Sequence, residues 1–169
     1  IHGPRIAGGR ADRPFLYRIP CTGKRPISFT AEQLPAGIQL DGKKGILRGR
    51  TPSQSGDYIV ILKADNDQGS DRREFKIVVG DRLALTPPMG WSSWYAWYDG
   101  ISDPVIRQAA GAMIDSGMAD FGYQYIGIDD CWMYQVEGRD PLRNGKPRSP
   151  EGVILPNRLF PDMKALVEH

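Results

Sequence analysis

The stretch from Tyr125 to Trp132, with the sequence YIGIDDCW, constrains the fold more than any other part of the chain. Its apolar first half predicts a buried strand. The strand leads directly into two adjacent carboxylates, Asp129 and Asp130, and then into a thiol and an indole. Carboxylates at the end of a buried strand must be solvated in a cleft or hydrogen-bonded to an occupant of that cleft. We interpret these two acids as residues that hold the hydroxyl groups of a sugar.

The segment before this strand predicts a strand–helix–strand unit. A short strand leads into Met89–Trp94, and a helix follows whose N-terminal cap is Ser102 or Asp103 and whose end is Gly117. The apolar residues on one face of that helix are Val105, Ile106, Ala109, Ala110, Met113 and Ile114. Two strands joined by a helix are expected to be parallel, and ligands bind beyond the carboxyl ends of such strands. The residues Trp91–Trp94 and the two acids are therefore expected on one rim.

Aromatic residues are concentrated at the end of the first of these strands. Trp91 and Trp94 are followed closely by Tyr95, Trp97 and Tyr98. Aromatic faces suit the C–H face of a pyranose ring, whereas the alternative interpretation is plain core packing. Further on, Met133–Arg158 is predicted to be an exposed excursion, and a second helix is predicted to begin within Leu159–Val167.

The first half of the chain predicts a small all-β domain. Short apolar stretches with turn signals between them favour a β-sandwich of antiparallel strands. The predicted strands are Phe15–Ile19, Ile27–Thr30, Ile38–Leu40, Ile46–Arg48, Tyr58–Ala64 and Phe75–Val79, with a turn at Asn66–Gly69 between the last two. The proline pair Pro87–Pro88 cannot continue a sheet, and we place the boundary between two domains near Arg82. The predicted domains are 1–82 and 83–169.

Charge and rare residues limit the possible functions. Residues 1–82 carry 15 basic and 9 acidic side chains, and residues 83–169 carry 7 and 11. The basic residues form no stripe, so a nucleic-acid surface is not expected. The only histidines, His2 and His169, lie at the ends of the sequence, which argues against a Ser-His-Asp or Cys-His centre. The spacing of Cys21 and Cys131 suggests no disulfide framework and no metal site, and no apolar run has transmembrane length.

The first half resembles the immunoglobulin-like domains of bacterial surface and secreted proteins. The matching stretches are Leu34–Asp41, Gly45–Gly49, Gly56–Tyr58 and Ala64–Asn66. His2–Arg5 together with Tyr17–Pro20 is similar to a short cap that precedes such domains in some glycosidases. The resemblance implies a spacer or packing domain, with a sugar-binding module as the alternative. The resemblance also suggests a bacterial protein that is secreted, periplasmic or on the cell surface. The isoleucine at position 1 suggests that a signal segment was removed or that the sequence starts at an artificial boundary.

The second half resembles the start of the melibiase-type α-galactosidases (glycoside hydrolase family 27-like). The motifs are Leu85–Trp94, Gly122–Tyr125, Ile128–Trp132 and Phe160–Leu166, in this order, across residues 83–169. The resemblance implies a (β/α)₈ TIM barrel that is incomplete in this chain and a retaining hydrolase of terminal α-D-galactosides without metal or cofactor. It makes Asp129 and Asp130 ligands of the hydroxyls on the non-reducing galactose. Trp94 would form part of the pocket wall, with Trp91 close by.

The resemblance places the catalytic nucleophile and the acid/base on later barrel strands, outside this chain. A retaining glycosidase needs two carboxyls about 5 Å apart on opposite sides of the scissile bond. This sequence alone is therefore expected to be inactive. The chain departs from many members because Tyr95–Ile101 contains no cysteine to pair with Cys131, which is expected to be a free thiol. The alternatives are a non-catalytic carbohydrate-binding or surface protein, an α-N-acetylgalactosaminidase and a β-L-arabinopyranosidase, and the oligomeric state is open.

Overall fold

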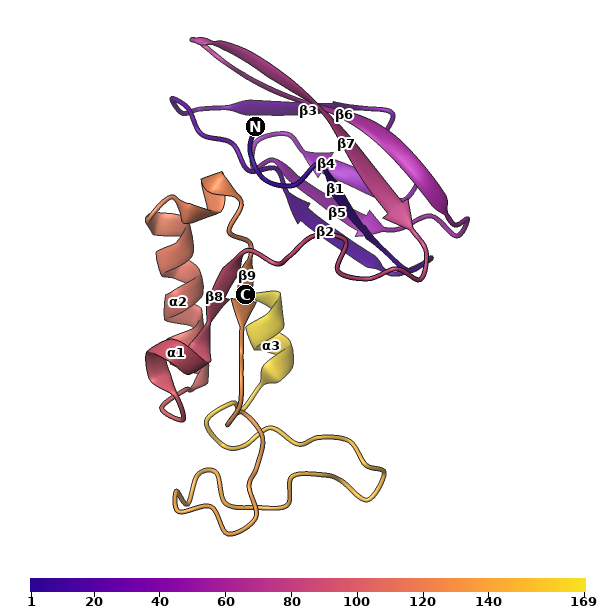
Figure 1. Cartoon of the computed structure of the whole chain (residues 1–169). Helices are drawn as coiled ribbons and strands as arrows, with labels where there is room; N and C mark the ends of the chain where they lie inside the picture. Colours follow the sequence, from indigo (N-terminus) through magenta and orange to yellow (C-terminus); the bar gives the residue numbers. More distant parts are fainter. The chain divides into compact units, whose positions relative to one another are not determined.

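The computed structural model describes residues 1–169 and divides into two compact units (Figure 1). The first unit contains Ile1–Met89 and Gly117–Gln124, and the second contains Gly90–Ser116 and Tyr125–His169. Each unit has its own buried apolar cluster. This division follows packing. The domain boundary near Arg82, which rests on the proline pair Pro87–Pro88, stays a prediction.

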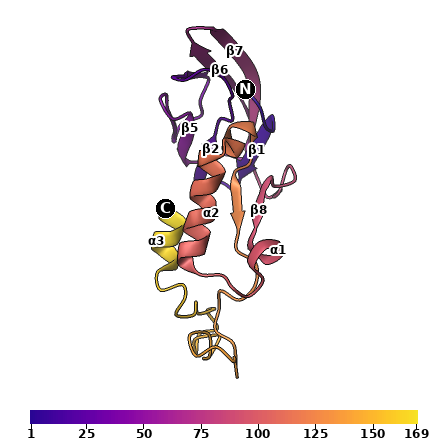
Figure 2. The same ribbon diagram turned by 90° about the vertical axis from the view of Figure 1, so that its left-hand side faces the viewer.

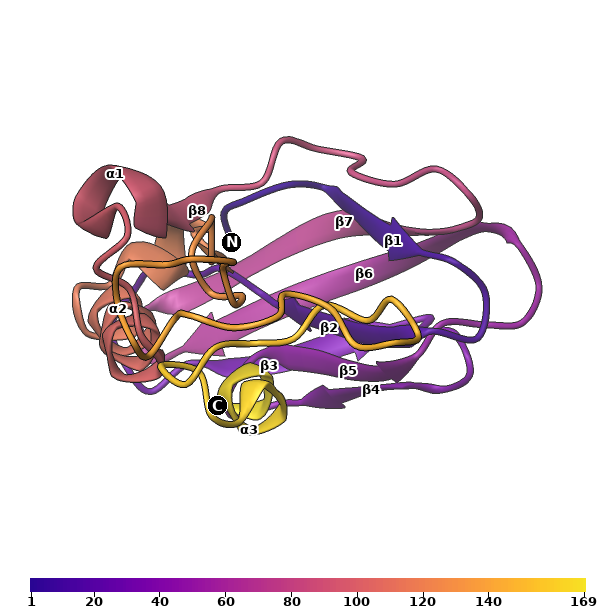
Figure 3. The same ribbon diagram turned by 90° about the horizontal axis from the view of Figure 1, so that it is seen from below.

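The first unit is a two-layered β-sandwich, as predicted. Its seven strands are β1 (Ile6–Gly9), β2 (Pro14–Arg18), β3 (Ser28–Glu32), β4 (Ile38–Asp41), β5 (Ile46–Arg50), β6 (Gly56–Asn66) and β7 (Gly69–Val79). One sheet has the order β1-β7-β6-β3 and the other has the order β2-β5-β4 (Figure 3). Every predicted strand is present, with its ends at most six residues from the expected positions.

Apolar side chains that alternate with polar ones along the strands fill the space between the two sheets. In one sheet, Phe75 and Ile77 on β7 and Val60 on β6 are completely buried. In the other sheet, Leu47 on β5 is completely buried. Because successive side chains of a strand point to opposite faces, each of these strands gives one face to the core. Tyr17 adds an aromatic contact, with its ring centroid 4.5 Å from that of Phe75.

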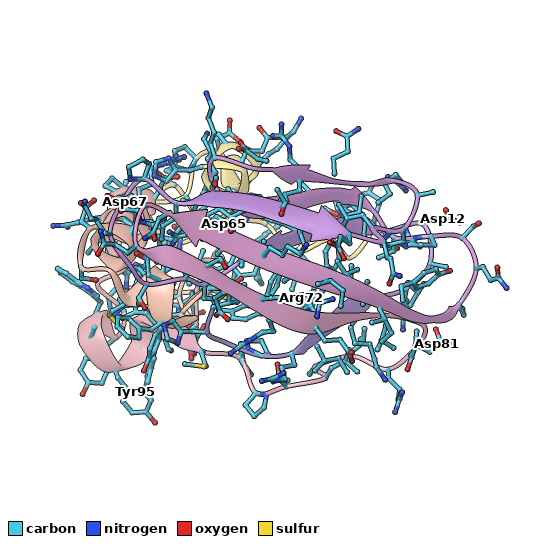
Figure 4. The ribbon with its side chains drawn as sticks, turned by 90° about the horizontal axis from the view of Figure 1, so that it is seen from above. Asp12, Asp65, Asp67, Arg72, Asp81 and Tyr95 are labelled. Atoms are coloured by element: carbon cyan, nitrogen blue, oxygen red, sulfur yellow. The ribbon has the colours of Figure 1, made fainter.

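The longest hairpin turns where the sequence predicts it. The side-chain oxygen of Asn66 accepts hydrogen bonds from the backbone N–H groups of Gln68 (2.9 Å) and Gly69 (3.1 Å), which fixes the turn between β6 and β7. Figure 4 shows Asp65 and Asp67 at this end of the hairpin and Arg72 farther along β7. The turn residues and the register of the two strands are thus set locally.

The first strand corrects the expectation of a purely antiparallel sandwich. β1 pairs in parallel with β7, with Ile6 opposite Lys76 and Gly9 opposite Val79. A Cβ atom on Gly8 would lie 2.0 Å from the backbone oxygen of Val78, so only glycine allows this approach. The Ile-Ala-Gly-Gly sequence of β1 has little strand propensity of its own, and β1 depends on its partner about 70 residues away.

The segment Gly117–Gln124 packs as part of the first unit although the sequence places it between a helix and a strand of the second half. It contains the 3₁₀-helix η1 (Met118–Phe121), which lies between two glycines with positive φ, Gly117 at 79° and Gly122 at 109°. The carboxylate of Asp120 accepts a hydrogen bond from Nη2 of Arg18 at 2.7 Å and is paired with Nη2 of Arg25 at 2.8 Å. One acid therefore compensates two cations of the sandwich.

Replacing Asp120 by asparagine is expected to lower the free energy of unfolding of the first unit by about 1–2 kcal/mol, because the Asp120 and Arg18 side chains are each only 25% exposed. The change keeps the shape and removes the charge that both arginines need. Differential scanning calorimetry of the chain measures the effect. Asp81→Asn is the matched control, since the Asp81 side chain is 98% exposed. Equal effects of the two substitutions would contradict the role given to Asp120.

The second unit contains the predicted parallel strand pair. The strands are β8 (Gly90–Ser92) and β9 (Tyr125–Gly127), with Trp91 opposite Ile126. The helices are α1 (Ser93–Trp97), α2 (Asp103–Asp115) and α3 (Met163–Glu168). Figure 2 shows α2 beside the two strands, with α3 next to α2. Ile101, Ile106, Phe160 and Leu166 are buried in the core of this unit.

The helix α2 differs from its prediction in two details. Pro104 lies in its first turn, but the side chain of Ser102 makes no capping hydrogen bond. Asp103 does not cap either, because its carboxylate binds Arg107 one turn later, at 2.7 Å from Nε. On the predicted apolar face, Ile106 and Met113 are buried, whereas Ile114 is 56% exposed. The helices, of which α2 has 13 residues, lack the length and apolar character of a membrane-spanning segment.

Candidate functional site

Asp129 and Asp130 follow β9 directly, and the end of β9 is connected to the start of α1. The backbone N–H of Asp129 donates a 2.9 Å hydrogen bond to Oγ of Ser93, the first residue of α1. Ser93 is completely buried, so this bond is shielded from water. The chain leaving β8 and the chain leaving β9 therefore meet at the carboxyl ends of the two parallel strands. The predicted convergence of both segments on one edge is present.

Each of the two carboxylates has one oxygen engaged by the backbone. Oδ1 of Asp129 accepts the N–H of Asp130 at 2.9 Å, and Oδ1 of Asp130 accepts the N–H of Cys131 at 2.6 Å. The second oxygen of each acid has no hydrogen-bond donor within the chain. Both side chains belong to exposed residues. The local backbone thus engages one oxygen of each carboxylate and leaves the other as an acceptor open to a ligand.

The two tryptophans predicted for the site have different positions. Trp94 lies in α1, and its ring meets that of Tyr98 edge to face, with the ring centroids 5.6 Å apart. Trp91 does not leave the strand as expected, because it is the middle residue of β8 and pairs with Ile126. Both indoles pack against the core of the second unit. Core packing therefore accounts for part of each tryptophan's role.

The remaining aromatic residues of this segment are exposed. Tyr95 is 88%, Trp97 47% and Tyr98 60% exposed. Figure 4 shows Tyr95 pointing away from the ribbon. These side chains follow Trp94 in the sequence and are not part of the core.

Cys131 is a free thiol, as predicted, and so is Cys21. Cys131 is buried and has φ = 72°, an unusual conformation for a residue with a side chain, at the point where the chain turns away from β9. Burial raises the pKa of the Cys131 thiol, and the charge of Asp130 raises it further, while Arg143 and a hydrogen bond from Gln135 act in the opposite direction. The thiol therefore stays protonated at neutral pH and serves as an apolar core group.

A buried amide that the sequence analysis did not single out fixes the turn after the two acids. Asn157 is 1% exposed, and its side-chain N–H₂ donates to the backbone oxygens of Cys131 (2.8 Å) and Met133 (3.1 Å). Its side-chain oxygen accepts the N–H of Leu159 at 3.0 Å. The available signal was a polar residue set between the apolar pairs Ile154-Leu155 and Leu159-Phe160. Periodicity alone does not reveal such a residue.

The segment Met133–Arg158 is more than the exposed excursion that was predicted. Isolated β-bridges join Met133 to Pro156, Gln135 to Asn144 and Arg148 to Ile154, so the segment folds back on itself. Arg143 is 9% exposed within it. Several other residues, including Val136 and Val153, are more than half exposed. No group of three His, Cys, Asp or Glu side chains is arranged to hold a metal ion.

Comparison with known families matches both parts of the chain. Residues 86–158 match the family model described as "Alpha galactosidase A", and residues 5–80 match the one described as "Putative Ig domain". The first match includes Asp129, Asp130, Trp91 and Trp94.

Individual proteins agree with these matches. An α-galactosidase of rice (Oryza sativa subsp. japonica) is 38% identical over 100 residues, which cover 58% of this chain and 21% of that protein. An α-galactosidase of Cyamopsis tetragonoloba is 40% identical over 114 residues, or 64% of this chain and 25% of that protein. The crystal structure of a "putative alpha-galactosidase" from Bacteroides fragilis superposes with a TM-score of 0.85 at 38% identity, covering 99% of this chain and 34% of that one.

The chain thus spans about a fifth to a quarter of these curated relatives and about a third of the solved one. The motifs that suggested an α-galactosidase from the sequence lie within the matched region, and the β-sandwich coincides with the second family match. Residues 86–158 are therefore similar to the α-galactosidase A family, and residues 5–80, which precede them, are similar to an Ig domain family.

Proposed function

We propose that this chain is the N-terminal part of a retaining α-galactosidase, which hydrolyses terminal α-D-galactosyl residues of oligo- or polysaccharides. The observation that carries the proposal is the pair of carboxylates at the end of β9. Asp129 and Asp130 each keep one oxygen without a donor in the chain, and Ser93 ties Asp129 to the segment that follows β8. The family match over residues 86–158 supports the reaction class.

The two acids would accept hydrogen bonds from neighbouring hydroxyls of the terminal galactose. A hydroxyl that donates to a carboxylate makes a short, strong hydrogen bond. A sugar that lacks the matching hydroxyl leaves the charge unpaired, which gives specificity. Trp94 would form part of the wall of this pocket, and Trp91 would support it from within β8.

We further propose that residues 83–169 begin a (β/α)₈ barrel. The parallel pair β8–β9, with α2 in the connection between them, is the repeating unit of such a barrel. Ligands in this fold bind at the carboxyl ends of the strands, which is where Asp129 and Asp130 lie. The nucleophile and the acid/base would come from later strands, so residues 1–169 alone are expected to lack hydrolytic activity. We also propose a bacterial secreted, periplasmic or cell-surface location, on the resemblance of the β-sandwich to domains of such proteins.

The proposal is tested by assaying the full-length protein that carries this chain on three aryl glycosides. These are the α-D-galactoside, its N-acetyl-α-D-galactosaminide analogue and the β-L-arabinopyranoside. We expect the first to be hydrolysed most efficiently and the first-formed product, followed by proton NMR, to be α-galactose. Preference for either of the other two would assign a different activity within the family. A sugar that binds without turnover of any of the three substrates would instead identify a non-catalytic carbohydrate-binding protein.

A further inference from the structure

A nearly buried cation lies in the segment that follows the two acids. The Arg143 side chain is 10% exposed, with Nη1 3.4 Å from Oδ2 of Asp99 and Nε 3.5 Å from Oδ2 of Asp140. Its Nε is buried without a hydrogen-bond partner. The burial of a guanidinium is costly, and it is tolerated where carboxylates remain close by.

One of the two ion pairs of Arg143 joins segments that are far apart in the sequence, and the other is local. Asp99 lies just after α1 and is 44 residues away from Arg143, whereas Asp140 is three residues away. Asp99 immediately follows Tyr98, whose ring packs on Trp94. The pair of Asp99 and Arg143 therefore acts on the segment that carries the proposed pocket wall.

The backbone of Arg143 is tied to the turn after the two acids. Its carbonyl oxygen accepts the N–H of Gln135 at 2.8 Å, and its own N–H donates to the oxygen of Asp140 at 3.0 Å. The side chain of Gln135 reaches back to Sγ of Cys131, at 3.6 Å, directly after Asp130. A continuous set of contacts thus leads from Asp99 through Arg143 and Gln135 to Cys131.

We propose that Arg143 is a positioning residue, which holds the segment after α1 against the segment after Asp130 and so fixes Trp94 relative to Asp129 and Asp130. The consequence for a sugar is a pocket wall kept at a constant distance from the two acids. This last step rests on the proposed function, whereas the link between the two segments does not. Preorganisation of this kind acts mainly on ligand affinity.

The test uses Arg143→Met and Asp99→Asn, separately and together, in the full-length protein. Hydrogen exchange followed by mass spectrometry reports on the peptides that contain residues 95–101 and 133–145. We expect Arg143→Met to speed exchange about tenfold in both peptides, since the link between them stabilises each against local opening. Asp99→Asn is expected to speed exchange in both as well, and the double variant is expected to resemble Arg143→Met alone, because the two residues act as a pair.

Controls separate this role from a general loss of stability. Arg139→Met removes an exposed arginine of the same segment and is expected to change neither peptide. If Arg143→Met does not fold, Asp99→Asn still carries the test, since the Asp99 side chain is 76% exposed and its loss leaves no cavity. Faster exchange confined to residues 133–145, or additive effects of the two substitutions, would overturn the proposal.

Kinetics provide the readout for positioning. On the aryl α-galactoside, Arg143→Met is expected to raise KM about tenfold while kcat changes less than about threefold. Arg143→Lys restores one charge but not the planar fork that faces two carboxylates, so it is expected to recover only part of the loss. A fall in kcat with unchanged KM would contradict a positioning role. If the wild type is inactive on this substrate, the proposed function fails, while hydrogen exchange still decides whether Arg143 joins the two segments.

Discussion

Asp130→Asn is expected to lower kcat/KM of the full-length enzyme on an aryl α-galactoside by about a hundredfold or more. The substitution keeps the size of the side chain and replaces the carboxylate by an amide, so the charge-assisted hydrogen bond to a sugar hydroxyl is lost. One carboxylate oxygen of Asp130 is already engaged by the N–H of Cys131, and the other is the one open to a ligand. Steady-state kinetics of the purified variant measure the effect.

A matched control for this prediction is Asp115→Asn, at the end of α2. Asp115 is exposed and belongs to the same unit, so its change removes the same charge at a distance from the proposed pocket. We expect kcat/KM of this variant to stay within about twofold of the wild type, as is usual for surface substitutions. Near-wild-type turnover by Asp130→Asn would refute the assignment of Asp130 to the pocket.

Asn157→Ala is expected to lower the free energy of unfolding of the second unit by about 2–4 kcal/mol. The change leaves the carbonyl oxygens of Cys131 and Met133 and the N–H of Leu159 without their partners in a buried place. Urea unfolding followed by tryptophan fluorescence measures the effect. All four tryptophans of the chain lie in the second unit, so their fluorescence reports on that unit.

The control for Asn157 is Asn144→Ala in the same segment. Asn144 is exposed, and its hydrogen bond to the backbone oxygen of Asp140 is donated by its backbone N–H rather than by its side chain. We expect its unfolding midpoint to stay close to that of the wild type. If both alanine substitutions lower the midpoint equally, the stabilising role of the Asn157 side chain is wrong.

The strands of the sandwich were predictable because their signals are local. Alternation along β6 and β7 and the Asn66–Gly69 turn depend on residues that are neighbours in the sequence. The strand β1 was missed because Ile6–Gly9 forms a strand only against β7, far along the chain. The packing of Gly117–Gln124 within the first unit was not predictable for a related reason, since only the partners of Asp120, Arg18 and Arg25, show where it packs.

The candidate site also has a part that the sequence predicted and a part that it did not. The two acids and Trp94 could be placed at one edge of the sheet from topology alone. Two strands joined by a helix are parallel, so their carboxyl ends lie together. That prediction needed only the order of the elements. The roles of Ser93 and Asn157 were not predicted because they consist of hydrogen bonds to backbone groups 24–36 residues away. Trp91 was placed wrongly relative to β8 because strand boundaries are weakly marked in a three-residue strand.

The sequence by itself determined the β-sandwich, the parallel strand pair and the identity of the acids that follow β9, because these depend on periodicity, turn chemistry and element order. Only the tertiary structure decided that each acid keeps one oxygen for a ligand, that Asn157 holds the turn behind them and that Arg143 is buried between Asp99 and Asp140. The physical reason is that hydrogen bonds and burial belong to pairs of groups brought together by folding, and no pattern along the chain records which groups meet.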